Sequence, residues 1–247
     1  MPRAIPIRLI VADLDGTLLN SSHVVSPFTE RAVREAIRRG VLVTVATGKT
    51  FHSTVDTIRQ FDIRIPVICA NGALVFEPDG ALLHADPIRR EYAIEAVRIG
   101  RSAGFTPVVY TRMGLLSTTL DENVLELLAY NEPVPGIIPD LETALANEVE
   151  PYKLMLMQQD PVAVTDLQIY LEEAFRGRAQ VVRSGLASLV EVLPLGVTKG
   201  TALAYILDHL SIAPEETISF GDNCNDLDLI RRAGIGVAMG HSPDDLR

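Results

Sequence analysis

The sequence predicts an α/β fold with a doubly wound, mostly parallel sheet as its core and an inserted α+β domain. Short apolar runs alternate with segments of helical period over about the first 70 residues and again from about residue 199. This alternation is typical of βαβ units. Between these two parts, a hairpin signal and mixed elements replace it. We therefore expect a core formed by 1–83 and 191–247 and an inserted domain at 84–190.

The first elements follow the pattern of a parallel sheet. Residues 7–12 predict a strand, and Ser26-Pro27 predicts the start of a helix, because serine caps the first turn and proline suits it. Gly40 predicts the end of that helix. The apolar runs that follow predict strands covered on both faces, at 41–46 and 66–69. The helix residues expected to face inward are Ala32, Val33, Ala36 and Ile37.

The pattern changes at a hairpin signal around Pro78-Asp79-Gly80, between apolar runs at 74–76 and 81–83. A segment with four prolines, 131–151, is expected to be a loop. Within the insertion we expect helices at about 89–102, 121–130 and 161–175, and strands at 105–111, 152–158, 179–183 and 187–193. The core pattern then returns with a helix from about 199, a strand at 217–220, a helix from about 224 and a strand at 235–238.

Composition and charge restrict the class of protein. The chain has 247 residues, 47% of them apolar, and its 32 acidic and 22 basic side chains give a net charge of −10. This composition suits a soluble globular protein, and the acidic balance disfavours nucleic acid and anionic membrane surfaces as partners. No apolar run reaches the roughly 18–20 residues of a membrane span. Because Met1-Pro2-Arg3 and the short run after it lack the features of a signal sequence, we expect a cytoplasmic protein.

The two cysteines further restrict the kinds of site that the sequence can form. Cys69 and Cys224 are far apart and lack the spacing of a zinc site or a disulfide framework. Residues 242–247 open another helix pattern with a serine and a proline, and the given sequence ends within it.

Two aspartates, Asp13 and Asp15, follow the first expected strand in the run Asp-Leu-Asp-Gly-Thr. Ligands bind at this end of the strands in open α/β sheets. Residues at i and i+2 of an extended chain point to the same side, so both carboxylates can face one reacting centre. A bound cation or a shared proton would relieve their repulsion. An ordinary turn is the alternative, whereas a calcium loop is excluded because Leu18 and Val24 stand where it needs glycine and an acid.

Two further segments suit an anion. Thr47 and Gly48 end the second expected strand with a hydroxyl and backbone amides, although Val43 stands where a P-loop needs glycine. Lys199 lies at the expected start of a helix, where a positive charge opposes the helix dipole at a cost of roughly 0.3–1 kcal/mol. That placement favours an anionic ligand, and a lysine that turns to solvent is the alternative.

The run from Gly221 to Asp228 is rich in carboxylate and amide oxygens and follows a third expected strand. Acids in the first turn of a helix are ordinary capping residues, but this density of oxygens also suits a hard cation. Neither a dinucleotide site nor a serine hydrolase is predicted, because the glycines at 234–240 are wrongly spaced and Ser184-Gly185 lacks the nucleophile motif. The five histidines are scattered and predict no metal site.

Taken together, these segments resemble the haloacid dehalogenase-like phosphatases, in particular the Cof-type branch with a large α/β cap. That family has four motifs in a fixed order, and the likeness covers nearly the whole chain. The matching segments are Asp13 to Thr17, Thr47-Gly48, Lys199 and Gly221 to Asp226, with further likeness at Asn71-Gly72-Ala73 and Gly234 to Gly240. The resemblance implies a Rossmann-like core and, at 84–190, a cap that selects the substrate.

The resemblance also implies catalytic roles. Asp13 would attack phosphorus and form an aspartyl-phosphate. Asp15 would protonate the leaving alkoxide and then take a proton from the attacking water. Thr47, Gly48 and Lys199 would hold the phosphoryl oxygens.

A magnesium site is implied in the same way. Mg²⁺ would be bound by Asp13, by the backbone carbonyl of Asp15 and by Asp222, with Asp226 as a supporting residue. The residues expected near the substrate are Asn71 and Asn225.

The expected function is therefore Mg²⁺-dependent hydrolysis of a small phosphate ester, such as a sugar phosphate or phosphoglycolate. A phosphotransferase or mutase on the same core and a catalytically silent metabolite-binding module are the alternatives. One residue departs from the family pattern. Lys49 stands where the family often has arginine, which removes bidentate geometry if this position contacts phosphate or an acidic partner.

Overall fold

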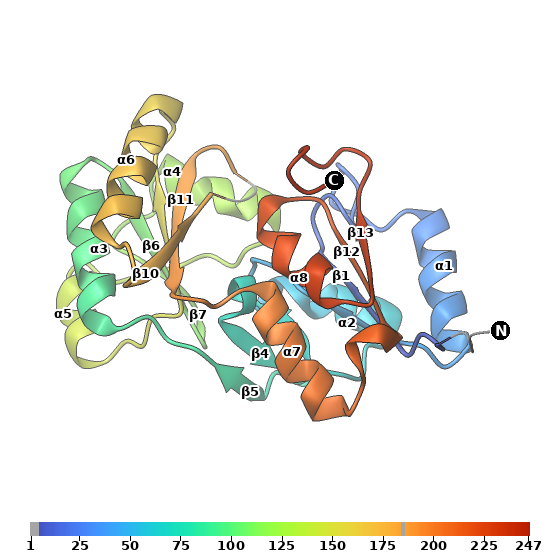
Figure 1. The fold of residues 1–247 in the computed structure, drawn as a ribbon. Coiled ribbons are helices and arrows are strands. Elements are labelled where there is room, and N and C mark those ends of the chain that lie inside the picture. Colours follow the sequence, from blue (N-terminus) through green and yellow to red (C-terminus); the bar gives the residue numbers. More distant parts are fainter. Residues whose placement is uncertain (1–4, 184–185) are drawn as a thin grey trace. The chain divides into compact units, whose positions relative to one another are not determined.

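A computed structural model of the chain describes residues 5–183 and 186–247. Met1-Pro2-Arg3 and Ser184-Gly185, considered above, lie outside the described residues. By its internal contacts the chain divides into a core unit, Met1–His84 with Thr198–Arg247, and an inserted unit, Ala85–Val197 (Figure 1). The predicted fold class, a parallel α/β core with an inserted α+β domain, is confirmed.

The core unit contains a four-stranded parallel sheet in which β1 lies between β12 and β2. Leu9 of β1 pairs with Thr217 on one side and with Leu42 on the other. A parallel bridge between Ala46 and Ile68 continues the sheet toward the next strand. In order across the sheet, the strands are β13 (Ile235–Ala238), β12 (Thr217–Gly221), β1 (Leu9–Ala12) and β2 (Leu42–Val45).

A smaller sheet of the core unit contains the predicted hairpin. Gly80 donates its backbone N–H to the carbonyl of Glu77, and Glu77 donates to the carbonyl of Ala81, which closes the turn. The order of the strands is β3 (Val67–Cys69), β4 (Leu74–Phe76) and β5 (Leu82–Ala85). The hairpin prediction is therefore confirmed.

Helices cover both faces of the parallel sheet, with α7 and α8 on one side and α1 on the other (Figure 1). Ser26 caps α1 and Thr198 caps α7 through their side-chain oxygens. The helices of the core unit are α1 (Pro27–Arg38), α2 (Val55–Phe61), α7 (Lys199–Leu210) and α8 (Leu227–Arg232). Its short 3₁₀ turns are η1 (His52–Thr54), η2 (Ala70–Gly72), η4 (Pro214–Glu216) and η5 (Cys224–Asp226). The sequence did not predict α2, η1, η2 or η4, whereas the helix predicted from about residue 224 corresponds to η5 followed by α8.

The predicted inward face of α1 needs correction. Val33 and Ala36 are half-buried, but Ala32 and Ile37 are exposed. At 3.6 residues per turn the four side chains span an arc of about 140°, and Val33 and Ala36 occupy its middle. Only the middle of the apolar arc is covered.

The inserted unit is built on a six-stranded, largely antiparallel sheet. Its strands lie in the order β10 (Ala179–Val182), β11 (Leu189–Pro194), β9 (Lys153–Met157), β6 (Thr106–Thr111), β7 (Gly114–Ser117) and β8 (Gly136–Ile137). Its helices are α3 (Arg90–Ser102), α4 (Glu122–Leu125) with the 3₁₀ turn η3 (Glu126–Tyr130), α5 (Leu141–Asn147) and α6 (Pro161–Ala174). The expected loop at 131–151 is wrong, because it contains β8 and α5, and β7 was also not predicted.

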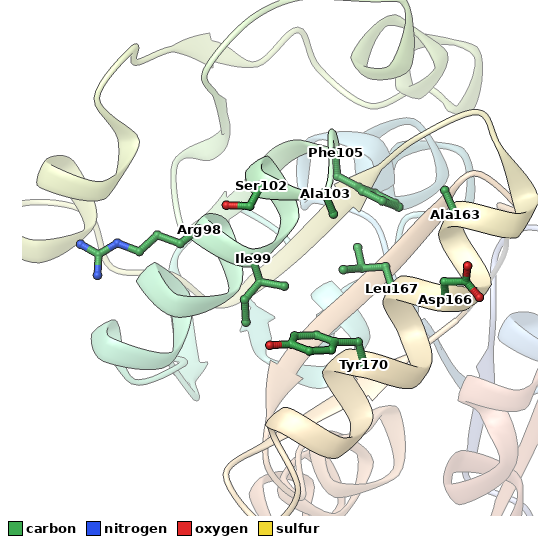
Figure 2. A pocket seen from close by; sticks show the side chains of 9 residues that line it. All are labelled: Arg98, Ile99, Ser102, Ala103, Phe105, Ala163, Asp166, Leu167 and Tyr170. Carbon is green, nitrogen blue, oxygen red and sulfur yellow. The ribbon is translucent and has the colours of Figure 1, made fainter.

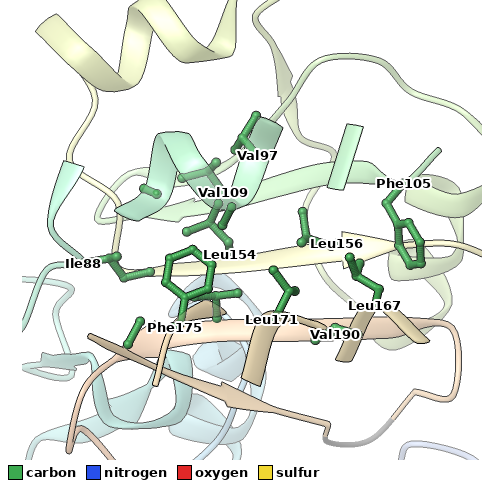
Figure 3. Close-up of a cluster of buried hydrophobic side chains, with 14 of the residues drawn as sticks. Ile88, Val97, Phe105, Val109, Leu154, Leu156, Leu167, Leu171, Phe175 and Val190 are labelled. Atoms are coloured by element: carbon green, nitrogen blue, oxygen red, sulfur yellow. The ribbon is translucent and has the colours of Figure 1, made fainter. Parts of the chain in front are cut away.

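The inserted unit has a hydrophobic core of its own. Alternate residues of β6 and β9, such as Val109 and Leu154, meet side chains of α3 and α6, such as Val97 and Leu171 (Figure 3). This is the period of two expected of a sheet with one face against helices. The boundary expected between 190 and 191 falls inside β11, all of which belongs to this sheet.

Gly72 brings the turn after β3 against the start of α7. Its φ is +101°, and a Cβ there would lie 2.1 Å from the carbonyl oxygen of Thr198. We expect Gly72→Ala to lower the free energy of unfolding by about 3–4 kcal/mol, because a methyl group meets rigid backbone. Gly40→Ala is the matched control, since Gly40 has φ +83° and open space around it. It should cost about 1–2 kcal/mol in urea unfolding, and equal losses in the two variants would contradict the close approach.

Candidate active site

The segments singled out in the sequence lie at one edge of the core unit. Asp13 follows β1, Thr47 follows β2, Asn71 follows β3, and the Gly221 to Asp226 run begins at the end of β12. Because these strands are parallel, their carboxyl ends meet at the same edge, where open α/β sheets bind ligands.

A buried ion cluster joins three of these segments. The Nζ atom of Lys199, the first residue of α7, lies 2.6 Å from Asp13 Oδ1 and 2.6 Å from Asp226 Oδ1. Lys199 is 1% exposed and Asp13 is 6% exposed. A charge buried this deeply needs partners of opposite sign. The side chain of Thr198 caps α7 and so fixes where this helix starts. This places the Lys199 ammonium among the carboxylates.

Burial also changes the acidity of the cluster. It raises the pKa of Asp13 to about 7, against the lowering effect of Lys199 and with added repulsion from Asp226 and Asp222. Burial disfavours the charge of Lys199, but Asp13 and Asp226 outweigh it and hold the pKa of the ammonium above its usual range. Lys199 is therefore a permanent cation at this edge.

Three carboxylates of the cluster have the spacing of a metal site. Oxygens of Asp13, Asp222 and Asp226 lie within 4.8 Å of one another. Oxygen ligands of one Mg²⁺ lie about 3–4 Å apart, because each Mg–O distance is about 2.1 Å. Gly16 has φ +79°, and a Cβ there would come within 2.4 Å of Asp222 Oδ2. The Asp222 carboxylate therefore has the room it needs only because residue 16 is glycine.

Asp226 is more fully engaged than the other two. Its Oδ2 accepts the backbone N–H groups of Asp222 and Asn223, each at 3.0 Å, while Oδ1 accepts from Lys199. Asp222 instead accepts from Thr17 Oγ1 at 3.0 Å and lies 3.5 Å from His241 Nε2. The donor set thus fits Mg²⁺ with Asp13 and Asp222 as ligands and Asp226 as the residue that shapes the loop.

Asp15 belongs to a second ion cluster. Lys49 Nζ lies 2.9 Å from its Oδ1 and 2.7 Å from its Oδ2. His23 Nδ1 lies 3.0 Å from the same Oδ1. The side chain of Asp15 is 31% exposed, so this carboxyl reaches solvent while that of Asp13 is buried.

Thr47, Gly48, Asn71 and Asn225 form a polar group beside these clusters. The backbone N–H of Asn71 donates to the carbonyl of Thr47, and Asn71 Oδ1 accepts from Asn225 Nδ2 at 2.9 Å. A Cβ on Gly48 would lie 2.9 Å from Asn71 Oδ1. Asn225 Oδ1 is buried and has no hydrogen-bond partner among the described residues. This amide oxygen is thus available to a ligand donor.

Sequence reasoning missed several contacts of the site. The hydroxyl of Thr17 was quoted only as part of its motif, and Lys49 only as a departure from the family. His23 and His241 were counted among scattered histidines, and nothing in their spacing could have placed them here. Both lie in loops whose course no local pattern predicts.

A groove of about 670 Å³ in the inserted unit lies between α3 and α6 (Figure 2). Arg98 extends away from the groove, and its guanidinium donates to Glu142. The side chains that line it include Ile99, Phe105, Leu167 and Tyr170, with Asp166 as the only carboxylate among the described lining residues. This set offers neither paired acids nor a nucleophile with a base.

Paired acids, a buried ammonium and a turn rich in oxygens at the edge of a parallel sheet suit phosphoryl transfer. The model of the haloacid dehalogenase-like hydrolases matches residues 10–247. The chain therefore belongs to this family, as its sequence motifs implied. No helix in the described part of the chain is both long and apolar enough to cross a bilayer.

Individual relatives agree with this assignment. The chain is 30% identical over 243 residues to the HMP-PP phosphatase of Cronobacter sakazakii, covering 97% of this chain and 86% of that protein. It is 26% identical to a haloacid dehalogenase-like hydrolase of B. subtilis of known structure, with a TM-score of 0.85 and coverage of 97% and 92%. An Arabidopsis thaliana protein named Endoribonuclease YBEY, chloroplastic, is 27% identical over 246 residues, but the chain spans only 42% of its length.

Proposed function

We propose that the protein is a Mg²⁺-dependent phosphomonoesterase that hydrolyses a small phosphorylated metabolite through an aspartyl-phosphate. One observation carries the proposal: Asp13, Asp222 and the Lys199 ammonium meet in one buried cluster at the ligand edge of the sheet. A carboxylate attacks an anionic phosphate only where positive charge offsets their repulsion. Lys199 supplies a permanent part of that charge.

The two aspartates divide the chemistry. A carboxylate oxygen of Asp13 forms a bond to phosphorus while the bond from phosphorus to the ester oxygen breaks. Asp15 gives its proton to the leaving alkoxide and later removes a proton from the water that hydrolyses the acyl phosphate. The buried position of Asp13 suits the nucleophile, and the partly exposed position of Asp15 suits exchange of protons with solvent.

The remaining residues bind and orient. Thr47, the backbone at Gly48 and Lys199 hold the phosphoryl oxygens, while Asn71 and Asn225 contact the substrate. Mg²⁺ would be held by Asp13, Asp222 and the backbone carbonyl of Asp15, with Asp226 fixing the loop that carries Asp222. When bound, the cation neutralises charge on the phosphoryl oxygens.

We assign substrate selection to the inserted unit. It contains most of the 84–190 segment that the sequence predicted to be a cap. The name of the Cronobacter relative, HMP-PP phosphatase, supports a small phosphorylated metabolite as the substrate class. A sugar phosphate or phosphoglycolate fits that class. A panel of phosphate esters with Mg²⁺ tests the proposal through release of inorganic phosphate, and transfer of phosphate to added sugars instead would show a phosphotransferase.

Removal of divalent cations should abolish turnover. With excess chelator we expect phosphate release to fall at least about 100-fold, because the three carboxylates of Asp13, Asp222 and Asp226 then lack the divalent charge that offsets their repulsion of an anionic phosphate. Addition of Mg²⁺ beyond the chelator should restore the rate, while addition of Na⁺ at equal ionic strength should not. Turnover that is insensitive to the chelator would count against the proposed mechanism.

A further inference from the structure

We propose that His23, together with Lys49, positions the carboxyl group of Asp15 for proton transfer to the leaving group. The inference rests on the proposed function, because it concerns the residue that acts as acid and base in that reaction. It gives a positioning role to a histidine that lies outside the sequence motifs of the family. His23 does not contact the phosphoryl group in this proposal, and it acts only through Asp15.

The contacts of Asp15 come from two loops, its own loop after β1 and the loop after β2. Lys49, in the loop after β2, reaches both carboxylate oxygens, and His23 reaches Oδ1. The Nδ1 atom of His23 lies 3.0 Å from Asp15 Oδ1, and it donates the hydrogen bond whenever Asp15 is ionised. Two donors from different directions restrict both torsions of the aspartate side chain.

The loop that carries His23 folds back, so that the His23 side chain reaches Asp15. The backbone N–H of Asn20 donates to the carbonyl of Val24, and the N–H of His23 donates to the carbonyl of Asn20. The side-chain oxygen of Asn20 accepts from the N–H groups of Ser22 and Val24. His23 itself has φ +55°, a left-handed conformation that is uncommon outside glycine. Strained backbone of this kind persists where surrounding contacts fix it.

Stability alone does not explain this arrangement. The side chains of His23 and Asp15 are 32% and 31% exposed, and ion pairs at such positions contribute little to folding. Orientation of a proton donor, in contrast, is worth large factors in rate, because general acid catalysis needs the donor within hydrogen-bond reach of the leaving oxygen. A positioning role therefore accounts for the contact better than a stabilising one.

The positioning role predicts that the loss of activity in a His23 variant depends on the leaving group of the substrate. A poor leaving group, such as the alkoxide of glucose 6-phosphate, needs a proton from Asp15 as the ester bond breaks. p-Nitrophenolate leaves without one. The value of kcat/KM covers the steps through departure of the leaving group, so it isolates this effect from the later hydrolysis step.

The test compares His23→Gly with His23→Asn, measured with a sugar phosphate that the wild-type enzyme hydrolyses and with p-nitrophenyl phosphate. Glycine removes the donor and tolerates the positive φ, whereas asparagine keeps an N–H donor and also tolerates it. Val24→Ala is the matched control, since Val24 is an exposed neighbour in the same loop. Thermal unfolding midpoints verify that each variant folds.

For His23→Gly we expect kcat/KM with the sugar phosphate to fall about 10- to 100-fold, and to fall at least about tenfold more than with p-nitrophenyl phosphate. His23→Asn should recover the sugar phosphate value to within about threefold, and Val24→Ala should match the wild type. Equal losses with both esters, or no loss, would overturn the inference while leaving the proposed function intact. If the wild-type enzyme releases phosphate from no ester of the panel, the proposed function fails as well.

A second pair of variants covers the case in which His23→Gly does not fold. Lys49→Met removes the other anchor of Asp15, and Lys49→Arg retains a cationic donor at the same place. The same ratio of kcat/KM values applies. A shift of about tenfold in Lys49→Met that Lys49→Arg reverses supports the positioning role, and an unchanged ratio rejects it.

Discussion

Asp13→Asn is expected to lower kcat by at least about 10⁴-fold while leaving the fold intact. The amide has the shape of the carboxyl group but cannot attack phosphorus. It also removes one negative charge from a cluster in which burial already raises the pKa of Asp13 to about 7. The variant should therefore be at least as stable as the wild type. Phosphate release with Mg²⁺ measures the loss, and urea unfolding measures the stability.

Two controls make this result specific. Asp166→Asn changes an exposed acid of the inserted unit and should retain wild-type turnover. Mass spectrometry of the enzyme quenched in acid during turnover should show an added phosphoryl group on Asp13 in the wild type and none in Asp13→Asn. Near-normal turnover in Asp13→Asn would defeat the assignment of the nucleophile.

Lys199→Met is expected to lower both activity and stability. The ammonium is buried and pairs with both Asp13 and Asp226, and its removal leaves these two nearby carboxylates without that partner. Breaking a buried pair in this way costs about 3–5 kcal/mol. We expect a loss of that size in urea unfolding at pH 8 without Mg²⁺. We also expect at least about 10²-fold lower kcat, because the phosphoryl oxygens lose a cationic partner.

The pH dependence of the Lys199→Met defect provides an internal check. Protonation of one carboxyl relieves the repulsion, so the loss of stability should be smaller at pH 5 than at pH 8. Arg232→Met is the matched control, since Arg232 pairs with Asp228 at the surface. That variant should lose less than about 1 kcal/mol at either pH. A defect in Lys199→Met that does not depend on pH would contradict a buried carboxylate pair.

The core could be predicted because its signals are local. Apolar runs marked β1, β2 and β3, and a capping serine followed by proline marked the start of α1. Once the strands are parallel, polar residues that follow them must meet at one edge. This geometry brings Asp13, Thr47 and Asn71 together without any knowledge of their side-chain contacts.

The missed elements are those whose signals are short or ambiguous. The four prolines of 131–151 predict a loop, but Pro135 directly precedes β8 and Pro139 lies just before α5. Proline restricts the backbone of its own residue and of the residue before it, so it does not prevent an element from starting directly after it. β7 has only two apolar residues, between Gly114 and Ser117, and the seven residues of α2 are too few for a clear helical period.

The contacts of the second ion cluster could not be predicted from local sequence patterns, for another reason. The contact of His23 with Asp15 depends on a left-handed residue and on the closure of the loop after β1, neither of which a hydrophobic pattern encodes. Lys49 was noticed only because it replaces an expected arginine. Its pairing with Asp15 depends on the geometry of two loops, one after β1 and one after β2.

The divided core unit has a consequence for synthesis. β1 and β2 leave the ribosome early and pair with each other, but the other edge of β1 is matched by β12, which follows the whole inserted unit. Meanwhile the inserted unit can collapse around its own apolar cluster. Closure of so long a chain segment costs entropy. The nascent protein therefore carries a half-built sheet with an open apolar strand edge, a surface of the kind that chaperones cover.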